Sequence, residues 1–300
     1  MDMTQNKCCR HGANLRRRRR RRRKILRSII FSCSIIAVAV FVAVGSRMIT
    51  SGDGGTNKYD VEAGNNTYDN AVIENSKISE KNKIQNNQSM LDDIMNSTQY
   101  PKQLKDLALK NDEALEFVYD YPAEHVKEHT IDLTEEASMD SVPLFVQWDK
   151  RWGYEKYSGN FFAASGCGPT TLSMVVVYLT HNREASPIAV AKYSKEAGYS
   201  VDGSGSSWTL ISEGCMHYGV KAKAVALDES RMKAELDEGH PIVVNVGPGD
   251  FTDIGHFMVI TGYDDEGFSI NDPNSIEKSG KRWLFRNISS QIRAVWSMYV

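Results

Sequence analysis

The stretch SGCGPTTLSMVVVYLT, residues 165–180, decides the fold of this chain. It carries an uninterrupted apolar run from Leu172 to Leu179, and Pro169 stands just before that run. Proline fits the first turn of a helix, because its missing N–H has no partner to lose there. The stretch therefore predicts a largely buried helix with Cys167 at its N-terminus.

Cys167 at this position is a candidate nucleophile. Free amide N–H groups and the helix dipole at an N-terminus stabilise a thiolate, which is the reactive form of cysteine. The neighbours Gly166 and Gly168 leave room for a substrate backbone to approach the sulfur. The competing interpretation is a small buried apolar side chain, which is the commoner fate of a lone cysteine.

Two polar residues further along the chain can complete such a site. His256 opens an apolar strand, and Asp272 directly follows the next strand, 267–271, across a turn at 264–267. A carboxylate beside an imidazole holds it in the tautomer that a general base needs. Each residue alone is also compatible with a structural hydrogen bond or a turn. The order Cys, His, Asp, with the last two on one hairpin, favours catalysis.

The surrounding pattern predicts an α+β fold with helices first and antiparallel strands later. Periodicity predicts helices over 187–198, 206–218 and 231–238, and strands over 241–246, 256–263, 267–271 and 294–300. Two short helices over 101–110 and 112–120 have too few apolar residues for a core of their own. We therefore predict a catalytic domain over 141–300 and, over 99–140, short helices that pack on it.

The charge is divided unevenly along the chain. Of the 36 Lys and Arg residues, twelve lie before Ile29 together with a single acid, so the first 28 residues carry a net +11. The remaining residues carry −13, which argues against a nucleic-acid partner. The 41% hydrophobic content excludes a fully disordered chain, and five cysteines in 300 residues exclude a disulfide-stapled scaffold.

The N-terminal part predicts a membrane anchor. Residues 28–46 contain no charged side chain, and as a helix they would span about 28 Å, close to the ~30 Å hydrocarbon core of a bilayer. The arginines of the preceding segment, 1–27, predict a cytoplasmic tail and a body outside the membrane. The Asn-rich residues 47–98 predict a disordered linker. The alternatives are a cleaved signal peptide, and nucleic-acid binding or nuclear import by the arginine run.

The cysteines predict no metal site. The chain contains no CxxC pair, so zinc binding is poorly supported, and no cofactor is expected. Cys167 and Cys215 are the only cysteines after the apolar span, and they could form one bridge.

From Val142 to Val300 the chain resembles the C39-like cysteine peptidases, a branch of the papain-like fold. The resemblance is carried by VPLFVQWDKRW (142–152), SGCGPTTLSM (165–174), GSSWTLI (205–211), GHFMVITGYD (255–264) and INDP (270–273). It implies a helical part that bears Cys167 as nucleophile. It also implies an antiparallel sheet that bears His256 as base and Asp272 as the residue that orients it. Gln147 is implied as an oxyanion-hole side chain, with the backbone N–H of Cys167 as second donor.

The chain departs from the family pattern in two places. Gln147 lies 20 residues before Cys167, whereas papain and the bacteriocin-processing C39 peptidases have a gap of only a few residues, so residues 152–164 must loop out. Papain orients its histidine with an asparagine, so Asn271 is an alternative to Asp272. Successive residues of a strand point to opposite faces, and only one of the two can face His256. We favour Asp272 for the charge it adds beside an imidazolium.

Together these features predict a membrane-anchored, extracytoplasmic cysteine peptidase that acts on a peptide or protein substrate. A non-catalytic peptide- or cell-wall-binding module on the same fold remains an alternative, as does a Cys-dependent amidase or transferase. The transporter-fused leader peptidases of the family carry an ATPase and six membrane spans. This chain has no GxxxxGK[ST] sequence and one predicted span, so the leader-peptidase role is not predicted.

Overall fold

The structure is a computed structural model that describes residues 66–300. The predicted cytoplasmic tail (1–27), membrane helix (28–46) and first part of the linker lie outside the described residues. Within 66–300, no helix combines the length and the hydrophobicity needed to cross a membrane.

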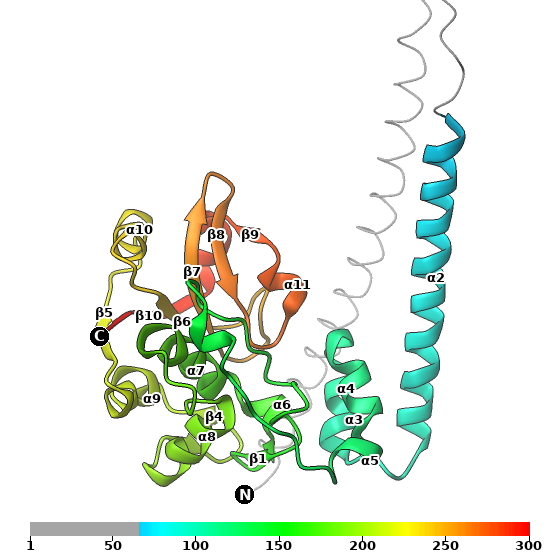
Figure 1. The fold of residues 1–300 in the computed structure, drawn as a ribbon, viewed down its shortest axis with the longest axis horizontal. Helices are drawn as coiled ribbons and strands as arrows, with labels where there is room; N and C mark the ends of the chain where they lie inside the picture. The colour runs from blue at the N-terminus through cyan, green and yellow to red at the C-terminus, as the bar shows by residue number, and fades with distance from the viewer. Residues whose placement is uncertain (1–65) are drawn as a thin grey trace, which may run out of the picture. The chain divides into compact units, whose positions relative to one another are not determined.

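A six-stranded antiparallel sheet with the order β5-β10-β6-β7-β8-β9 forms the centre of the described chain (Figure 1). In chain order its strands are β5 (Lys221–Ala224), β6 (Ile242–Val246), β7 (His256–Asp264), β8 (Gly267–Asn271), β9 (Arg282–Trp283) and β10 (Ile292–Tyr299). Most helices precede these strands in the sequence, and the predicted α+β class is confirmed. Strand β5 was missed by the sequence analysis because it is short and largely exposed.

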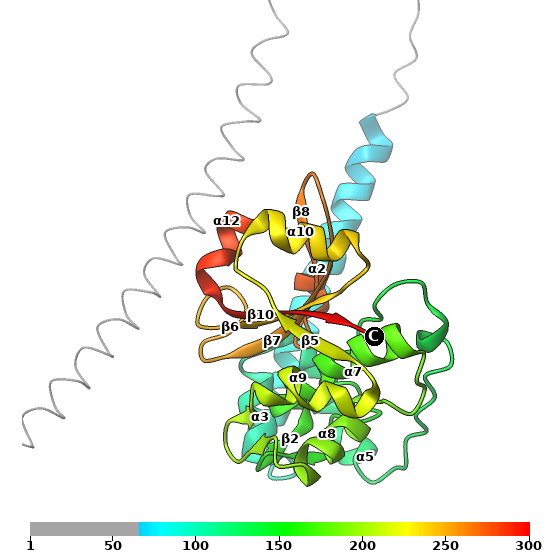
Figure 2. The same ribbon diagram turned by 90° about the vertical axis from the view of Figure 1, so that its left-hand side faces the viewer.

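The sheet is apolar on both faces, because its central strands alternate between two clusters of buried side chains. Val243, Phe257 and Val259 belong to a first cluster that also contains Leu, Met, Val and Ala side chains of the helices α7 (Cys167–Thr180) and α8 (Pro187–Glu196). The alternate residues belong to a second cluster, which is completed by α10 (Glu229–Asp237) and α12 (Phe285–Ile288). Figure 2 shows α10 and α12 on one side of the sheet, and α7, α8 and α9 (Thr209–Ser212) on the other.

Helix α7 is the most deeply buried helix of residues 141–300. It begins at Cys167, as predicted, and its residues from Gly168 to Val177 are all buried. It packs against β7 and α8. The helix ends at Thr180 and is capped by His181, which adopts a left-handed conformation and donates its N–H to the carbonyl of Val177. The apolar run therefore fixes the N-terminal residue of α7 against the sheet.

Residues 152–164 form the loop-out that the position of Gln147 required. They contain a two-stranded hairpin of β1 (Lys156–Tyr157) and β2 (Asn160–Phe161), followed by the start of the short helix α6 (Phe162–Ser165). The hairpin turns at Ser158 and Gly159, both of which have positive φ, as a two-residue turn requires. After this insertion the chain reaches the start of α7.

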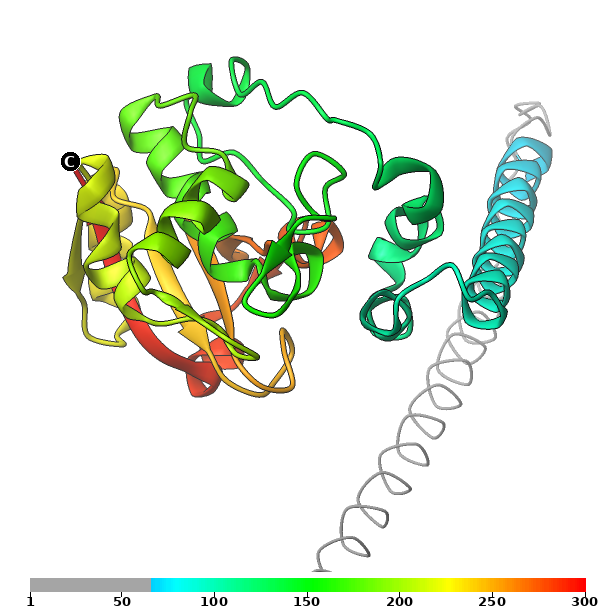
Figure 3. The same cartoon turned by 90° about the horizontal axis from the view of Figure 1, so that it is seen from below.

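The described helices before residue 141 are α2 (Asn66–Asn96), α3 (Lys102–Ala108), α4 (Leu115–Tyr119) and α5 (Tyr121–Glu124), with the 3₁₀ turn η1 (Asp112–Ala114) before α4. The buried residues of α3, η1 and α4 form a third cluster together with Phe161 and Ala163 of the insertion. After α5 the chain runs as an extended segment to the 3₁₀ turn η2 (Glu136–Ser138) (Figure 3). The N-terminal helices and the insertion therefore share one apolar core.

Helix α2 differs from the predicted disorder of residues 47–98. Its 31 residues contain no glycine or proline, and Gln88 donates to Asp92 one turn later at 2.8 Å. Near its C-terminal end Ile94 is fully buried in the third cluster, and Met90 and Leu91 pack against that cluster. A segment poor in large apolar residues can still be helical when one end of it is packed in this way.

Two other predicted helices are divided in the structure. The predicted helix 112–120 consists of η1 and α4, with Asn111 as the N-cap whose side chain accepts from the N–H of Glu113. The predicted helix 206–218 consists of α9 and the 3₁₀ turn η3 (Gly214–Tyr218). Gly214 packs against Tyr199 so closely that a Cβ there would lie 3.1 Å from its ring.

Candidate active site

Cys167 is the first residue of α7 and is half-buried. The two glycines beside it serve close packing. A Cβ on Gly166 would lie 2.5 Å from the ring of Phe162, and a Cβ on Gly168 would lie 2.5 Å from the Ser206 hydroxyl. The thiol therefore sits in a tightly packed N-terminal turn, with the short helix α6 and strand β4 (Gly205–Ser206) against it.

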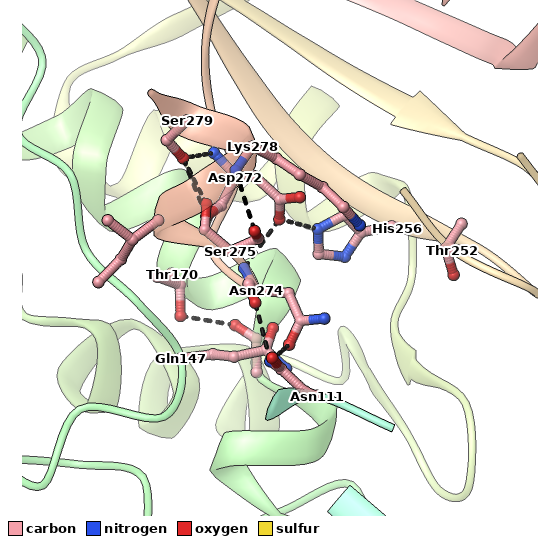
Figure 4. A network of polar contacts seen from close by, with 12 residues as sticks. Asn111, Gln147, Thr170, Thr252, His256, Asp272, Asn274, Ser275, Lys278 and Ser279 are labelled. Carbon is pink, nitrogen blue, oxygen red and sulfur yellow. Dashed lines mark hydrogen bonds and ion pairs between the residues drawn. The ribbon is translucent and has the colours of Figure 1, made fainter. Parts of the chain in front are cut away.

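His256 is the first residue of β7 and is 6% exposed. Its Nε2 lies 2.6 Å from Oδ1 of Asp272, at the end of the neighbouring strand β8 (Figure 4). The structure thus joins His256 to Asp272, and the hydrogen bonding and charge of His256 also act on the Cys167 thiol. A short hydrogen bond between a buried imidazole and a buried carboxylate is the geometry that orients a catalytic histidine.

Asp272 is fully buried. Its Oδ1 accepts hydrogen bonds from His256 and from the backbone N–H of Asn274, the latter at 2.8 Å. Its own N–H donates to the Ser279 hydroxyl at 2.9 Å. Within residues 81–300, Oδ2 has no hydrogen-bond partner. A carboxylate in such a place favours a positive charge on the imidazole next to it.

Asn271 has a different role from Asp272. Its side-chain amide donates to the carbonyls of Val142 and Pro143, each at 3.1 Å. Successive residues of a strand point to opposite faces, which explains the difference. Asp272 lies on the same face as buried Ile270, whereas Asn271 lies on the other face. Of the two alternatives, Asp272 is the one that contacts His256.

The electrostatics of the pair favour a charged Cys–His couple. Burial lowers the pKa of His256, but the charge and hydrogen bond of Asp272, together with Cys167, outweigh it and raise the pKa to about 10. Burial raises the pKa of the Cys167 thiol, but hydrogen bonding and charge from His256 outweigh it and hold the pKa below its ordinary value. The N–H of Gly168 contributes in the same direction. At neutral pH this combination favours a thiolate beside an imidazolium.

Replacing Cys167 with alanine is expected to make the free energy of unfolding fall as pH rises above about 6.5, because Asp272 still raises the pKa of His256 in the folded chain. Above 6.5 the unfolded chain loses the His256 proton while the folded chain keeps it, so this contribution is complete below 6.5 and is lost as pH rises through the folded pKa, which lies below that of the unaltered protein because the contribution of Cys167 is absent. In the unaltered protein the folded chain holds Cys167 as a thiolate, whereas the unfolded chain holds it as a thiol. Cys167 therefore makes the free energy of unfolding rise with pH, which opposes the fall that His256 causes. Urea unfolding at several pH values measures the difference. A fall that persists in Cys167→Ala/Asp272→Asn would contradict this explanation.

Gln147 is buried between the turn after Asp272 and the segment before α7. Its Nε2 donates to the carbonyl of Ala163 at 2.7 Å, and its backbone N–H donates to the carbonyl of Pro273 at 2.7 Å. The second N–H of the side-chain amide remains available. The insertion explains how a glutamine 20 residues before the cysteine reaches this place, because the β1–β2 hairpin returns the chain to Ala163.

Cys215 lies outside this constellation. It is fully buried, and burial raises the pKa of its thiol to about 11. Both Cys167 and Cys215 are free thiols, so the bridge that the sequence left open is not formed. Trp208 is half-exposed and meets the Trp296 ring edge-on, with centroids 6.0 Å apart.

One group of possible metal ligands lies on the surface among the described residues, formed by Glu235, Glu238 and His240. The carboxylate of Glu235 is already used by Lys223 at 3.0 Å, Ser297 at 2.7 Å and His240 at 3.3 Å. The Ser297 hydrogen bond, followed by those from Lys223 and His240, lowers the pKa of Glu235 to about 2. The group is therefore explained by its own ion pairs.

Sequence reasoning missed the residues that hold the Asp272 turn in place. Asn274 and Ser279 bond Asp272 directly, and Asn111 and Glu113 contact the same turn from a segment 163 residues earlier. The Asp272-Pro273 pair is a turn signal in the sequence, but it does not indicate which residues hold the turn. No local signal marked Asn111 or Glu113, because their partners lie far away in the sequence.

Two solved structures are similar to this chain. The peptidase domain of Streptococcus ComA, a bi-functional ABC transporter involved in a quorum-sensing pathway, is 19% identical, with a TM-score of 0.39, and the match covers 53% of this chain and 96% of that chain. A C39-like peptidase from Bacillus anthracis is 16% identical, with a TM-score of 0.34, and the match covers 53% of this chain and 95% of that chain. No curated protein matches the chain.

The sequence profile of the Peptidase C39-like family matches residues 139–300, more than half of the chain and the whole segment that bears Gln147, Cys167, His256 and Asp272. The chain therefore belongs to the C39-like peptidase family.

Proposed function

We propose that this protein is a cysteine peptidase that hydrolyses peptide bonds through Cys167, His256 and Asp272. The observation that carries the proposal is the 2.6 Å contact between His256 and Asp272, together with the action of His256 on the Cys167 thiol, whose pKa it lowers. Family membership supports a peptide or protein substrate.

The reaction that we propose begins with the Cys167 thiolate. It attacks the carbonyl carbon of the peptide, a C–S bond forms, and the carbonyl oxygen takes the negative charge. As the C–N bond breaks, imidazolium His256 gives its proton to the leaving amine, and an acyl-enzyme remains. Neutral His256 then takes a proton from water, the resulting hydroxide attacks the thioester, and the C–S bond breaks. The released acid and the restored thiolate–imidazolium pair balance the cycle.

The proposed oxyanion hole consists of the side-chain amide of Gln147 and the backbone N–H of Cys167. One N–H of Gln147 is held by Ala163, which fixes the amide plane and leaves the other N–H to donate. The first N–H groups of α7 have no partner within the helix, and they add a favourable dipole at the same place.

Replacing Gln147 with alanine is expected to lower kcat by about 10²–10³-fold, because one preorganised donor to the oxyanion is lost. KM is expected to change little, since the donor acts mainly in the transition state. The pH dependence of Cys167 alkylation should stay the same, because the Cys–His–Asp contacts remain. Steady-state kinetics with a cleavable peptide and alkylation profiles measure both. A kcat equal to that of the unaltered protein would exclude Gln147 from the oxyanion hole.

We further propose a location outside the cytoplasmic membrane, with a single N-terminal anchor. The support comes from the sequence alone, namely the uncharged residues 28–46 and the arginines before them. A membrane-impermeant thiol reagent added to intact cells tests it. Labelling of Cys167 without lysis agrees with the proposal, and labelling only after lysis contradicts it.

Product analysis separates peptide hydrolysis from the two alternatives that use the same fold. Purified full-length protein and its Cys167→Ala variant are incubated with an unstructured protein and with peptidoglycan, and the products are identified by mass spectrometry. Peptides with new amino and carboxyl termini that depend on Cys167 support a peptidase. A binding module would retain its ligand in the Cys167→Ala variant and give no products, and an amidase would release peptides from peptidoglycan only.

A further inference from the structure

The turn that carries Asp272 is held from outside the family domain. The family match begins at residue 139, whereas Asn111 and Glu113 lie earlier, at η1 between α3 and α4. Both side chains are partly buried, and both contact the segment that directly follows Asp272.

Glu113 binds the start of helix α11 (Ile276–Ser279) with both carboxylate oxygens. Its Oε1 accepts from the Ser275 hydroxyl. Its Oε2 accepts from the backbone N–H groups of Ile276 and Glu277, at 2.7 and 3.0 Å. One side chain thus satisfies three donors of a single turn, and hydrogen bonds to a charged acceptor are stronger than neutral ones.

Asn111 binds the residue before that turn. Its Nδ2 donates to the backbone carbonyl of Asn274 at 2.9 Å and to the Asn274 side-chain oxygen at 3.1 Å. Its Oδ1 accepts from the backbone N–H of Glu113 at 3.0 Å, so the Asn111 side chain is also bound to the backbone of Glu113. The indole of Trp148, next to Gln147, donates to the same Asn274 carbonyl at 3.3 Å.

These contacts lead directly to the His256 hydrogen bond. The N–H of Asn274 donates to Asp272 Oδ1, the same oxygen that lies 2.6 Å from His256 Nε2. The N–H of Ser275 donates to the carbonyl of Asp272 at 3.1 Å. Figure 4 shows Asn274 between Asn111 and Asp272. A displacement of Asn274 or Ser275 would therefore turn the carboxylate that orients the histidine.

The segment that bears Asn111 and Glu113 is itself fixed by packing. Ala114 and Leu115 follow Glu113 directly and are buried in the third cluster. That cluster also contains Phe161 and Ala163, and the Ala163 carbonyl accepts from Gln147. The N-terminal helices thus rest on the insertion beside Gln147 and reach across to the Asp272 turn.

We propose that Asn111 and Glu113 are positioning residues, which hold the Asp272 turn so that His256 stays oriented toward Cys167. The inference rests on the proposed function, since it assigns these residues a part in the same Cys–His–Asp site. It makes the helices before residue 139 part of the working enzyme. A shortened chain that begins at residue 139 would lack this support.

The test measures the alkylation of Cys167 by iodoacetamide against pH in the full-length protein, with the labelled peptide identified by mass spectrometry. The readout is the acidic midpoint, the pH at which the rate reaches half its plateau. Glu113→Ala and Asn111→Ala are each expected to raise this midpoint by about one pH unit, which slows alkylation below it about tenfold. Glu113→Gln keeps one oxygen acceptor and should have a smaller effect. In an Asp272→Asn background, neither alanine change should move the midpoint further.

Asp112→Ala is the matched control, because Asp112 lies between the two residues and its side chain is exposed. Circular dichroism establishes which variants fold, and Asn111→Ala and Glu113→Gln carry the test if Glu113→Ala does not. If the acidic midpoint of Cys167 alkylation is low in the unaltered protein and is the same in the folded variants, the role of Asn111 and Glu113 is overturned and the proposed function is not. This holds even if the Tm of the variants falls. An ordinary thiol profile in the unaltered protein overturns the proposed function and the inference with it.

Discussion

Replacing His256 with alanine is expected to lower peptide hydrolysis at pH 7 by on the order of 10⁴-fold, the upper end of what one acid–base group contributes. The variant loses both the cation that favours the Cys167 thiolate and the acid that protonates the leaving amine. The buried Asp272 carboxylate would also lose its partner, so Tm should fall as well. Initial rates with a cleavable peptide, taken well below the Tm of each variant, measure the effect.

The matched control is His217→Ala. His217 is exposed and stacks on Tyr193, with ring centroids 4.0 Å apart, so its replacement should leave the rate unchanged. Alkylation of Cys167 gives a second readout, because without His256 its acidic midpoint should move toward the ordinary thiol pKa of about 8.5. Hydrolysis by His256→Ala within tenfold of the unaltered rate would exclude His256 as the acid–base group.

Replacing Asp272 with alanine is expected to lower kcat by about 10³-fold, in the middle of the range for acid–base catalysis. The imidazole would lose the acceptor 2.6 Å from Nε2, and with it both its orientation and the charge that raises its pKa. Asp272→Asn keeps an oxygen in the same place and removes the charge, so its loss should be smaller. The ratio of the two kcat values separates orientation from charge.

The control for this series is Asp265→Ala, in the exposed turn of the β7–β8 hairpin. Asn271→Ala is informative as well, because the Asn271 amide donates to the carbonyls of Val142 and Pro143, whereas the His256 hydrogen bond goes to Asp272. It should lower Tm more than it changes the alkylation midpoint. If Asn271→Ala raises the midpoint more than Asp272→Ala does, Asn271 and not Asp272 orients the histidine.

The sequence was most informative where a pattern is local. The apolar run after Pro169 predicted α7 and the position of Cys167 on it. The run indicates a buried helix, and the proline beside it indicates where that helix begins. The β7–β8 hairpin was predicted for the same reason, and it brings His256 and Asp272 to neighbouring strand ends. The alternation of side chains along a strand showed that only one of Asn271 and Asp272 can face His256. The structure shows that it is Asp272.

What the sequence did not predict depends on contacts between distant segments. The segment of helix α2 was predicted to be disordered, because it contains few large apolar residues. The packing of Ile94 against residues of α3 and α4 cannot be inferred from the composition of the segment. The insertion was predicted only as a loop, although its hairpin carries Ala163 to Gln147. The contacts of Asn111 and Glu113 join residues more than 160 positions apart, and no periodicity encodes such a pair.

The most direct test of the Cys–His–Asp site is the rate of Cys167 alkylation by iodoacetamide between pH 4 and 9 in the full-length protein. Label on Cys167 is followed by mass spectrometry, and buried Cys215, whose pKa is raised to about 11, is the internal reference. The site described here predicts an acidic midpoint well below the ordinary thiol pKa of about 8.5, with alkylation at pH 6 at least about tenfold faster than for a free cysteine. A midpoint near 8.5 that His256→Ala leaves in place would contradict it.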